Sequence, residues 1–208
     1  MMKIEKIAGE PDRAGRYFTT LTGGTTLRLY PQVIADLGLY PGCELDEAAY
    51  QKLLEMAGSA SAKMRAVRIV SASAVSSRDL EQRLVRKGED PAHAHAAVAW
   101  MSELNLVDDG ETARQIVRKG IARGYGVARV KQMLYEKQIP RELWPEALAD
   151  YPEQDEAIMA FLRSRLPEGF TEKDKKRAID ALLRRGHRWE EIRRCLSALD
   201  EEMEAYDE

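Results

Sequence analysis

The sequence predicts a mainly α-helical protein made of three tandem three-helix repeats in an elongated array, preceded by a small N-terminal α/β module. Composition is the first indication, because 32% of the 208 residues are charged, only 7% are aromatic, and glycine and proline are few. A helical spacing of apolar residues from about residue 63 to the end is the second. The third is that this helical pattern recurs about every 50 residues.

The recurrence is defined by aligned apolar positions. Gly88, Gln138 and Gly186 stand at equivalent points, 50 and 48 residues apart. Around them, five positions are apolar in every copy: Leu80, Val130 and Ala178; Leu84, Leu134 and Leu182; Ala94, Trp144 and Ile192; Ala97, Ala147 and Cys195; Val98, Leu148 and Leu196. Such a period is typical of stacked helical units, each of which buries one face on its neighbour and leaves an extended surface for a partner.

Helix-start and helix-end signals agree with these repeats. We expect helices over 64–74, 78–87 and 91–104, then 110–123, 127–137 and 140–149, then 155–165, 172–185 and 188–203. Ser77 is placed to cap the second helix, and Asp90-Pro91 is an N-cap followed by proline at the first helical position. The spacing Asp108-x-x-Glu111 resembles a capping box, and Thr171-x-x-Asp174 is a weaker version of it.

The first 58 residues have a different pattern. Two β-prone runs, 16–22 and 25–30, flank Gly23-Gly24 and predict a hairpin. Further expected elements are a short strand around Ile4 and Ile7, a short helix opened by Pro31, and a helix capped by Asp46 that ends near Ala57. Gly58-Ser59-Ala60-Ser61-Ala62 is typical of a linker. The expected domains are the module over 1–58 and repeats over 59–109, 110–152 and 153–208, the last with an acidic tail.

Membrane and secreted classes are disfavoured. The chain contains no run of 18 apolar residues, and its N-terminus is charged from residue 3, without the apolar stretch of a secretory signal. Cys43 and Cys195 lie too far apart in sequence to form a disulfide framework. We therefore expect a cytoplasmic, reduced protein.

Catalytic and metal-binding patterns find little support. His93 and His95 are two residues apart on an expected helix, so they point in different directions and do not suit one metal ion. His187 lies beside a helix junction and is expected to be an exposed or capping residue. Cys195 occupies an apolar repeat position and is expected in the core. Asp108-Asp109 precedes a helix, where capping explains the acids better than acid–base chemistry does. We expect no enzyme activity, no metal and no cofactor.

The net charge of −3 hides an uneven distribution. Residues 59–147 carry 15 basic and 11 acidic side chains, whereas residues 148–208 carry 11 and 16. Residues 112–141 hold eight lysines and arginines against one acid. Cations gathered around an aromatic residue on one turn suit a protein interface or a nucleic-acid backbone. The candidate partner-facing surface is Arg114, Arg118, Lys119, Arg123, Tyr125 and Arg129.

Three stretches of the chain carry recognisable motifs: Ser77–Gly88, Leu106–Arg114 and Arg123–Lys137. Together they resemble the RecX family of regulatory proteins. The stretch from Ser77 to Gly88 is similar to the family's Ser-x-x-Glu-Leu-x-x-Lys-Leu-x-x-Lys-Gly element. Leu106-Val107-Asp108-Asp109 with Ala113-Arg114 resembles Leu-(Leu/Val)-Asp-Asp-x-x-(Phe/Tyr)-Ala. The stretch from Arg123 to Val130, with Leu134 and Lys137, resembles Gly-x-x-(Arg/Lys)-(Ile/Val)-x-x-x-Leu-x-x-Lys-Gly-Ile. The resemblance covers about 64–150 directly and 151–200 through the repeat. The chain departs from it at Val75, Asp79, Thr112 and Gln138.

The resemblance implies three tandem three-helix repeats and a modulator of the RecA recombinase. Such proteins bind in the groove of the RecA filament on single-stranded DNA, and they usually block filament growth, ATP hydrolysis and strand exchange. The alternative that the residues leave open is a helical-repeat protein that binds DNA or RNA directly, and salt dependence separates the two. Weak direct DNA binding is also compatible with the first interpretation.

Overall fold

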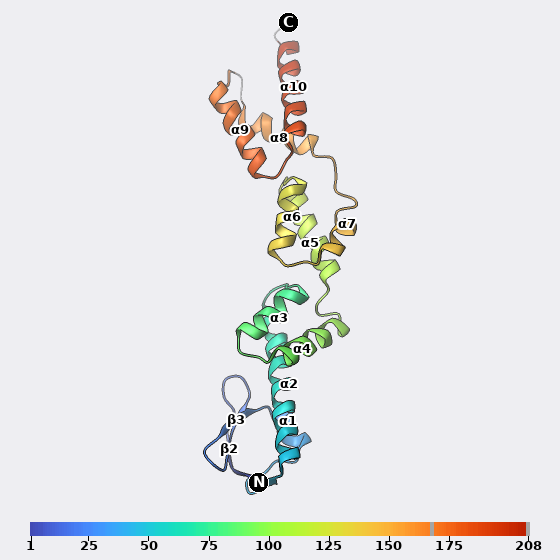
Figure 1. The fold of residues 1–208 in the computed structure, drawn as a ribbon. Helices are drawn as coiled ribbons and strands as arrows, with labels where there is room; N and C mark the ends of the chain where they lie inside the picture. Colours follow the sequence, from blue (N-terminus) through green and yellow to red (C-terminus); the bar gives the residue numbers. More distant parts are fainter. Residues whose placement is uncertain (167–168, 207–208) are drawn as a thin grey trace. The chain divides into compact units, whose positions relative to one another are not determined.

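The computed structural model describes residues 1–166 and 169–206 and confirms a mainly helical chain with a small N-terminal sheet (Figure 1). The chain divides into two compact units, Met1–Val107 and Asp108–Glu208. The expected limits of the N-terminal module and of the three repeats stay a prediction.

The first unit begins with a four-stranded antiparallel sheet in the order β3-β2-β1-β4. Its strands are β1 (Met2–Ile7), β2 (Tyr17–Leu21), β3 (Thr26–Leu29) and β4 (Glu44–Leu45), and α1 (Pro31–Asp36) follows β3. The hairpin expected around Gly23-Gly24 joins β2 to β3, and both glycines have positive φ. Ile4 of β1, Leu21 of β2 and Leu29 of β3 are fully buried in the core of this module.

The linker expected at residues 58–62 is wrong, because these residues lie inside the 26-residue helix α2 (Glu47–Ala72), capped by Asp46 as expected. Leu53 of α2 packs into the core beneath the sheet, and Ala62 and Ala66 pack into the core of the first repeat. The small residues serve close packing instead of flexibility. A β-carbon at Gly58 would overlap the imidazole of His93, and the Ser61 hydroxyl donates to Glu89 at 3.0 Å.

The remaining helices follow the predicted ranges closely. Repeat 1 consists of the second half of α2 with α3 (Ser77–Arg86) and α4 (Pro91–Glu103). Repeat 2 consists of α5 (Asp109–Ala122), α6 (Val127–Glu136), the 3-10 turn η1 (Arg141–Leu143) and α7 (Trp144–Ala147). Repeat 3 consists of α8 (Asp155–Arg165), α9 (Glu172–Arg184) and α10 (Trp189–Tyr206).

Three expected details of these helices need correction. The first helix of repeat 1 does not start at residue 64, since it is the end of α2, and the helix expected at 140–149 is only η1 with the four-residue α7. The cap of α3 is Ser76, not Ser77: the Ser76 side chain accepts a hydrogen bond from the amide of Asp79. Thr171 and Asp174 form a complete reciprocal capping box at α9.

The aligned apolar positions form the cores of the repeats. Leu84, Leu134 and Leu182 are each 0% exposed, and Cys195 is buried as expected. Repeat 2 is the exception. Its third-helix members Trp144 and Leu148 are only half-buried, because α7 is too short to cover the core as α4 and α10 do.

The middle helix of each repeat ends in the same turn. Gly88, Gln138 and Gly186 take positive φ values of 88°, 54° and 87°. In each turn the next amide donates back to the buried leucine carbonyl, for example Glu89 to Leu84 at 3.1 Å and His187 to Leu182 at 3.2 Å. This pattern satisfies carbonyls that the helix end would leave unpaired, and it fixes the direction in which the chain leaves.

Within the second unit, the Gly186 turn meets the turn between α5 and α6 and binds repeat 3 to repeat 2. The Gly126 amide donates to the carbonyl of Arg185 at 2.9 Å. A β-carbon on Gly126 would overlap the Gly186 carbonyl, and one on Gly186 would overlap the backbone of Arg129. The Tyr151 hydroxyl also donates to the carbonyl of Tyr125. The two turns therefore meet backbone to backbone, at a distance that only glycine permits.

We expect Gly126→Ala to destabilise the chain by about 2 kcal/mol, because an added methyl forces apart two backbones that cannot yield as flexible side chains do. Gly126 has an ordinary negative φ, so the effect is steric. The free energy of unfolding in urea measures it. The control is Gly9→Ala, since a β-carbon there meets no atom within 4 Å. Equal stability of the two variants would contradict this close contact.

Candidate partner-binding surfaces

Two of the predicted surface cations on α5 are paired. Arg114 Nε lies 3.0 Å from Glu111 Oε2, and Arg118 Nη2 lies 2.6 Å from Glu111 Oε1. These hydrogen bonds, that of Arg114 first, hold the pKa of the Glu111 carboxyl below its usual range. Arg114 also lies 3.4 Å from Glu146. The acid that neutralises these arginines stands one residue before the basic stretch 112–141, where the sequence count missed it.

The other predicted residues divide into two groups. Lys119 lies on α5 and Arg123 is the C-cap residue of that helix, and both are exposed. They are four residues apart, so they lie on the same side of the helix end. Arg129 on α6 is 3.5 Å from Glu136, and Tyr125 is half-buried in the turn with its carbonyl bonded to Tyr151. The structure thus leaves Lys119 and Arg123 as the cations of the predicted surface most available to a partner.

His187 lies in the junction between repeats 2 and 3, and the expectation that it is exposed or a capping residue is wrong. It is 4% exposed, and its Nε2 is 3.1 Å from the carbonyl of Gly124, which fits the tautomer with the proton on Nε2. Among the described residues, Nδ1 has no hydrogen-bond partner. Burial lowers the pKa of this imidazole, although the bond to Gly124 opposes that shift. The site therefore favours neutral histidine.

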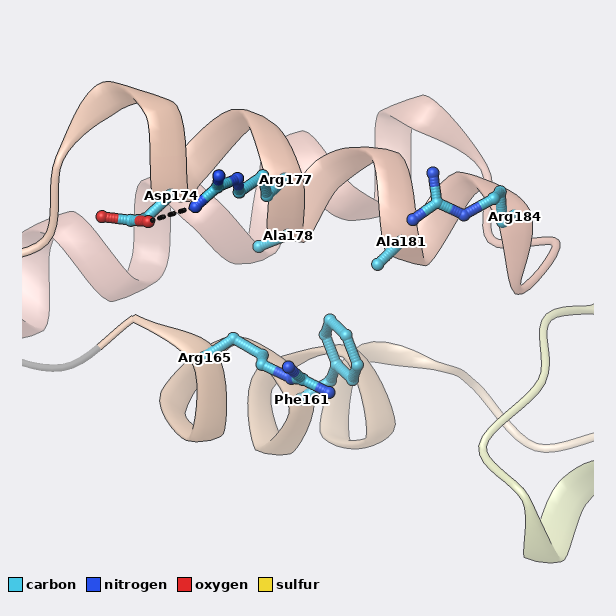
Figure 2. Close-up of a pocket in the computed structure, with 7 residues that line it drawn as sticks. All are labelled: Phe161, Arg165, Asp174, Arg177, Ala178, Ala181 and Arg184. Atoms are coloured by element: carbon cyan, nitrogen blue, oxygen red, sulfur yellow. Dashed lines mark ion pairs between the residues drawn. The ribbon is translucent and has the colours of Figure 1, made fainter.

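Sequence reasoning missed an arginine-lined cleft between α8 and α9, shown in Figure 2. The cleft has a volume of about 400 Å³. Its lining consists of Phe161, Arg165, Asp174, Arg177, Ala178, Ala181 and Arg184. The three arginines were hidden in the sequence because they lie in the segment with the largest acidic excess. The helical spacing of Arg177 and Arg184 on α9 was the signal that could have drawn attention to them.

Two guanidinium groups lie close to one aromatic ring beside this cleft. Arg185 lies 4.8 Å and Arg165 5.6 Å from the centroid of the Phe161 ring. Arg177 pairs with Asp174 at 3.5 Å. Among the side chains that the structure describes, in residues 1–166 and 169–201, neither Arg165 nor Arg184 has a carboxylate partner. The cleft therefore combines uncompensated positive charge with an aromatic group that orients it.

Among the described residues, no three histidine, cysteine, aspartate or glutamate side chains gather as a metal ion would require. His93 pairs with Glu55 at 3.0 Å, and His95 lies near Glu81 at 3.4 Å. None of the described helices combines the length and apolar character needed to cross a bilayer.

Comparison with known proteins gives consistent relatives. Residues 108–148 match the family described as "RecX, second three-helix domain". The chain is 30% identical over 153 residues to the Regulatory protein RecX of Halorhodospira halophila, an alignment that covers 71% of this chain and 95% of that protein. It is 24% identical over 203 residues to the Regulatory protein RecX of Clostridioides difficile, covering 95% of this chain and 94% of the relative.

Solved structures share the fold. A crystal structure of regulatory protein RecX superposes with a TM-score of 0.65 at 21% identity, covering 95% of this chain and all of the other. RecX from Lactobacillus salivarius superposes with a TM-score of 0.60 at 19% identity, covering 69% of this chain and 97% of that one.

We expect the stability of the chain to decrease as the pH falls below about 6.5, because the unfolded chain then takes up a proton that the buried His187 resists. The contribution is fully present above the unfolded pKa, and its slope is at most about 1.4 kcal/mol per pH unit. Urea unfolding between pH 7.5 and 5.5 measures it. His187→Gln, which retains a donor, should flatten the profile relative to the wild type.

The exposed His95 provides the control, because its side chain is 75% exposed. His95→Gln should leave the pH profile of the wild type unchanged. A profile that His187→Gln does not flatten would show that the buried imidazole contributes nothing to the pH dependence.

Proposed function

Because this chain belongs to the RecX family of regulatory proteins, we propose that it binds the RecA recombinase and inhibits its ATP hydrolysis, filament growth and strand exchange. The relationship of 30% identity across nearly the full length of a RecX protein is the observation that carries the proposal. The RecA filament on single-stranded DNA is the proposed partner, its groove the proposed binding place, and the cytoplasm the proposed location. The chain acts in this proposal by occupying a surface, without catalysis or cofactor.

An exposed apolar side chain at one position of every repeat supports a protein partner. Val85, Tyr135 and Leu183 are 40%, 64% and 44% exposed, on α3, α6 and α9. Each stands three residues before the left-handed residue that ends its helix, next to the buried leucine of the core. Their exposure means that the repeat cores do not require them. We call these three side chains the repeated apolar positions.

A basic residue accompanies each repeated apolar position. Lys87, Lys137 and Arg185 follow two residues later. Residues two apart at a helix end point to different sides, so each repeat presents an exposed apolar side chain and, on another side, a cation at the end of the helix. A nucleic-acid backbone alone has no use for the apolar member, so this pattern favours a protein partner.

Direct binding of DNA or RNA is the second candidate function, and the exposed Lys119 and Arg123 and the cleft between α8 and α9 favour it. The two candidates differ in salt dependence. Binding through phosphates weakens steeply as salt rises, because bound counterions are released, whereas an apolar protein contact is nearly insensitive to salt.

We expect the purified chain to inhibit the single-stranded-DNA-dependent ATP hydrolysis of RecA at well under one chain per RecA. Replacing Arg118, Lys119 and Arg123 together with alanine should weaken the inhibition about tenfold, because each of these three surface cations contributes modestly to binding. The matched control, Lys3→Ala with Lys6→Ala and Lys52→Ala, removes the same charge from the N-terminal module. No inhibition at equimolar ratio would refute the RecA proposal, and equal loss in both variants would refute the assigned surface.

Changing the repeated apolar positions to serine should also weaken RecA inhibition, and the loss should persist at high salt because the contact is apolar. Each single change should cost less than the triple change if all three repeats engage the partner. The control replaces Tyr40, Met64 and Leu104, which are comparably exposed but lie outside the repeated positions. Unchanged inhibition by the triple variant would exclude these positions from the interface.

A further inference from the structure

We propose that the cleft between α8 and α9 binds the phosphate groups of one nucleic-acid strand, without reading its bases. The lining of this site shares no residue with the candidate surface on α5 and α6 or with the repeated apolar positions. It gives the chain a direct contact with nucleic acid that does not pass through a partner protein.

The walls of the cleft supply the charge. Arg165 lies on α8, and Arg177 and Arg184 lie on α9, so guanidinium groups stand on both sides (Figure 2). Arg177 and Arg184 are seven residues apart, which places them two helical turns, or about 10 Å, apart along α9. Charges spaced along a groove suit a ligand with repeated anionic groups better than a single small anion.

The available charge exceeds what the fold neutralises. Asp174 is the only acid among the described residues of the lining, and it is held by Thr171 through the capping box and by Arg177. Hydrogen bonds from Thr171 lower the pKa of Asp174, so it stays ionised and keeps its pairing at neutral pH. Arg165 and Arg184 remain without a carboxylate among the described residues. Guanidinium groups offer paired donors that match phosphate oxygens.

The apolar lining indicates that phosphates, not bases, are recognised. Ala178 and Ala181 point from α9 toward α8, where Phe161 is the one aromatic ring of the lining (Figure 2). The guanidinium groups of Arg165 and Arg185 lie within 6 Å of that ring. A nucleobase would have to displace them in order to stack there, whereas a phosphate can meet them as they stand. Small alanines keep the cleft open for a backbone.

The test measures binding of a fluorescein-labelled oligothymidylate to the full-length chain by anisotropy, over a range of salt concentrations. The cleft variant is Arg165→Gln with Arg184→Gln. Its matched control is Arg78→Gln with Arg86→Gln, which removes the same charge from repeat 1, where Arg86 is the repeat equivalent of Arg184. All four side chains are exposed, so circular dichroism should show unchanged folding.

We expect the cleft variant to lose at least about tenfold in affinity and the control to lose much less. The slope of log affinity against log salt should fall by about 1.4 in the cleft variant, since each lost phosphate contact on a single strand contributes about 0.7. Equal losses in the two variants, or no binding by the wild type at low salt, would overturn the proposal.

Competition separates the possible sources of the negative charge. Unlabelled oligothymidylate should displace the probe at far lower anion concentration than polyglutamate or ATP. Displacement by polyglutamate at equal concentration would assign the cleft to an acidic protein segment instead, and displacement by ATP would assign it to a free nucleotide. The assay contains no RecA, so its result is independent of the inhibition proposed above.

Discussion

The left-handed turn at the end of each middle helix is the constraint on which the repeats depend. It requires positive φ at Gly88, Gln138 and Gly186, and it buries the residue that follows. In repeats 1 and 3 the side chain of that following residue then binds a neighbouring element. Glu89 binds Arg65 of α2 and His187 binds the turn of repeat 2, so a single backbone geometry serves different neighbours. Gln138 adopts this conformation without the freedom of glycine, at some cost in strain.

Close approach between segments explains several of the small residues along the chain. Glycine stands at Gly126 and Gly186 because backbone meets backbone there, and at Gly58 because an imidazole packs against the helix. In sequence, such residues indicate flexibility as readily as close approach. The family relationship and the helix boundaries agree with the sequence analysis because both rest on local patterns: apolar spacing, caps and glycine ends.

The distribution of unpaired charge on the surface depends on contacts between side chains more than the positions of the helices do. The run of eight basic residues is partly neutralised by Glu111, because one turn of α5 brings that carboxylate onto Arg114 and a second turn brings it onto Arg118. Guanidinium groups without a carboxylate partner among the described side chains instead occur in the segment with the most acidic composition, at Arg165 and Arg184. The net charge of a segment therefore reflects only its composition, whereas ion pairing decides which charges are available to a partner.

The sequence by itself determined the helical class, the three-copy pattern, the hairpin and nearly every helix boundary, since each follows from interactions within a few residues. Only the tertiary structure decided that residues 58–62 continue a helix, that His187 is buried, and that arginines from α8 and α9 line one cleft. These features depend on which groups approach one another across the chain. Helical periodicity fixes the face on which a side chain lies, but packing between helices chooses its neighbours.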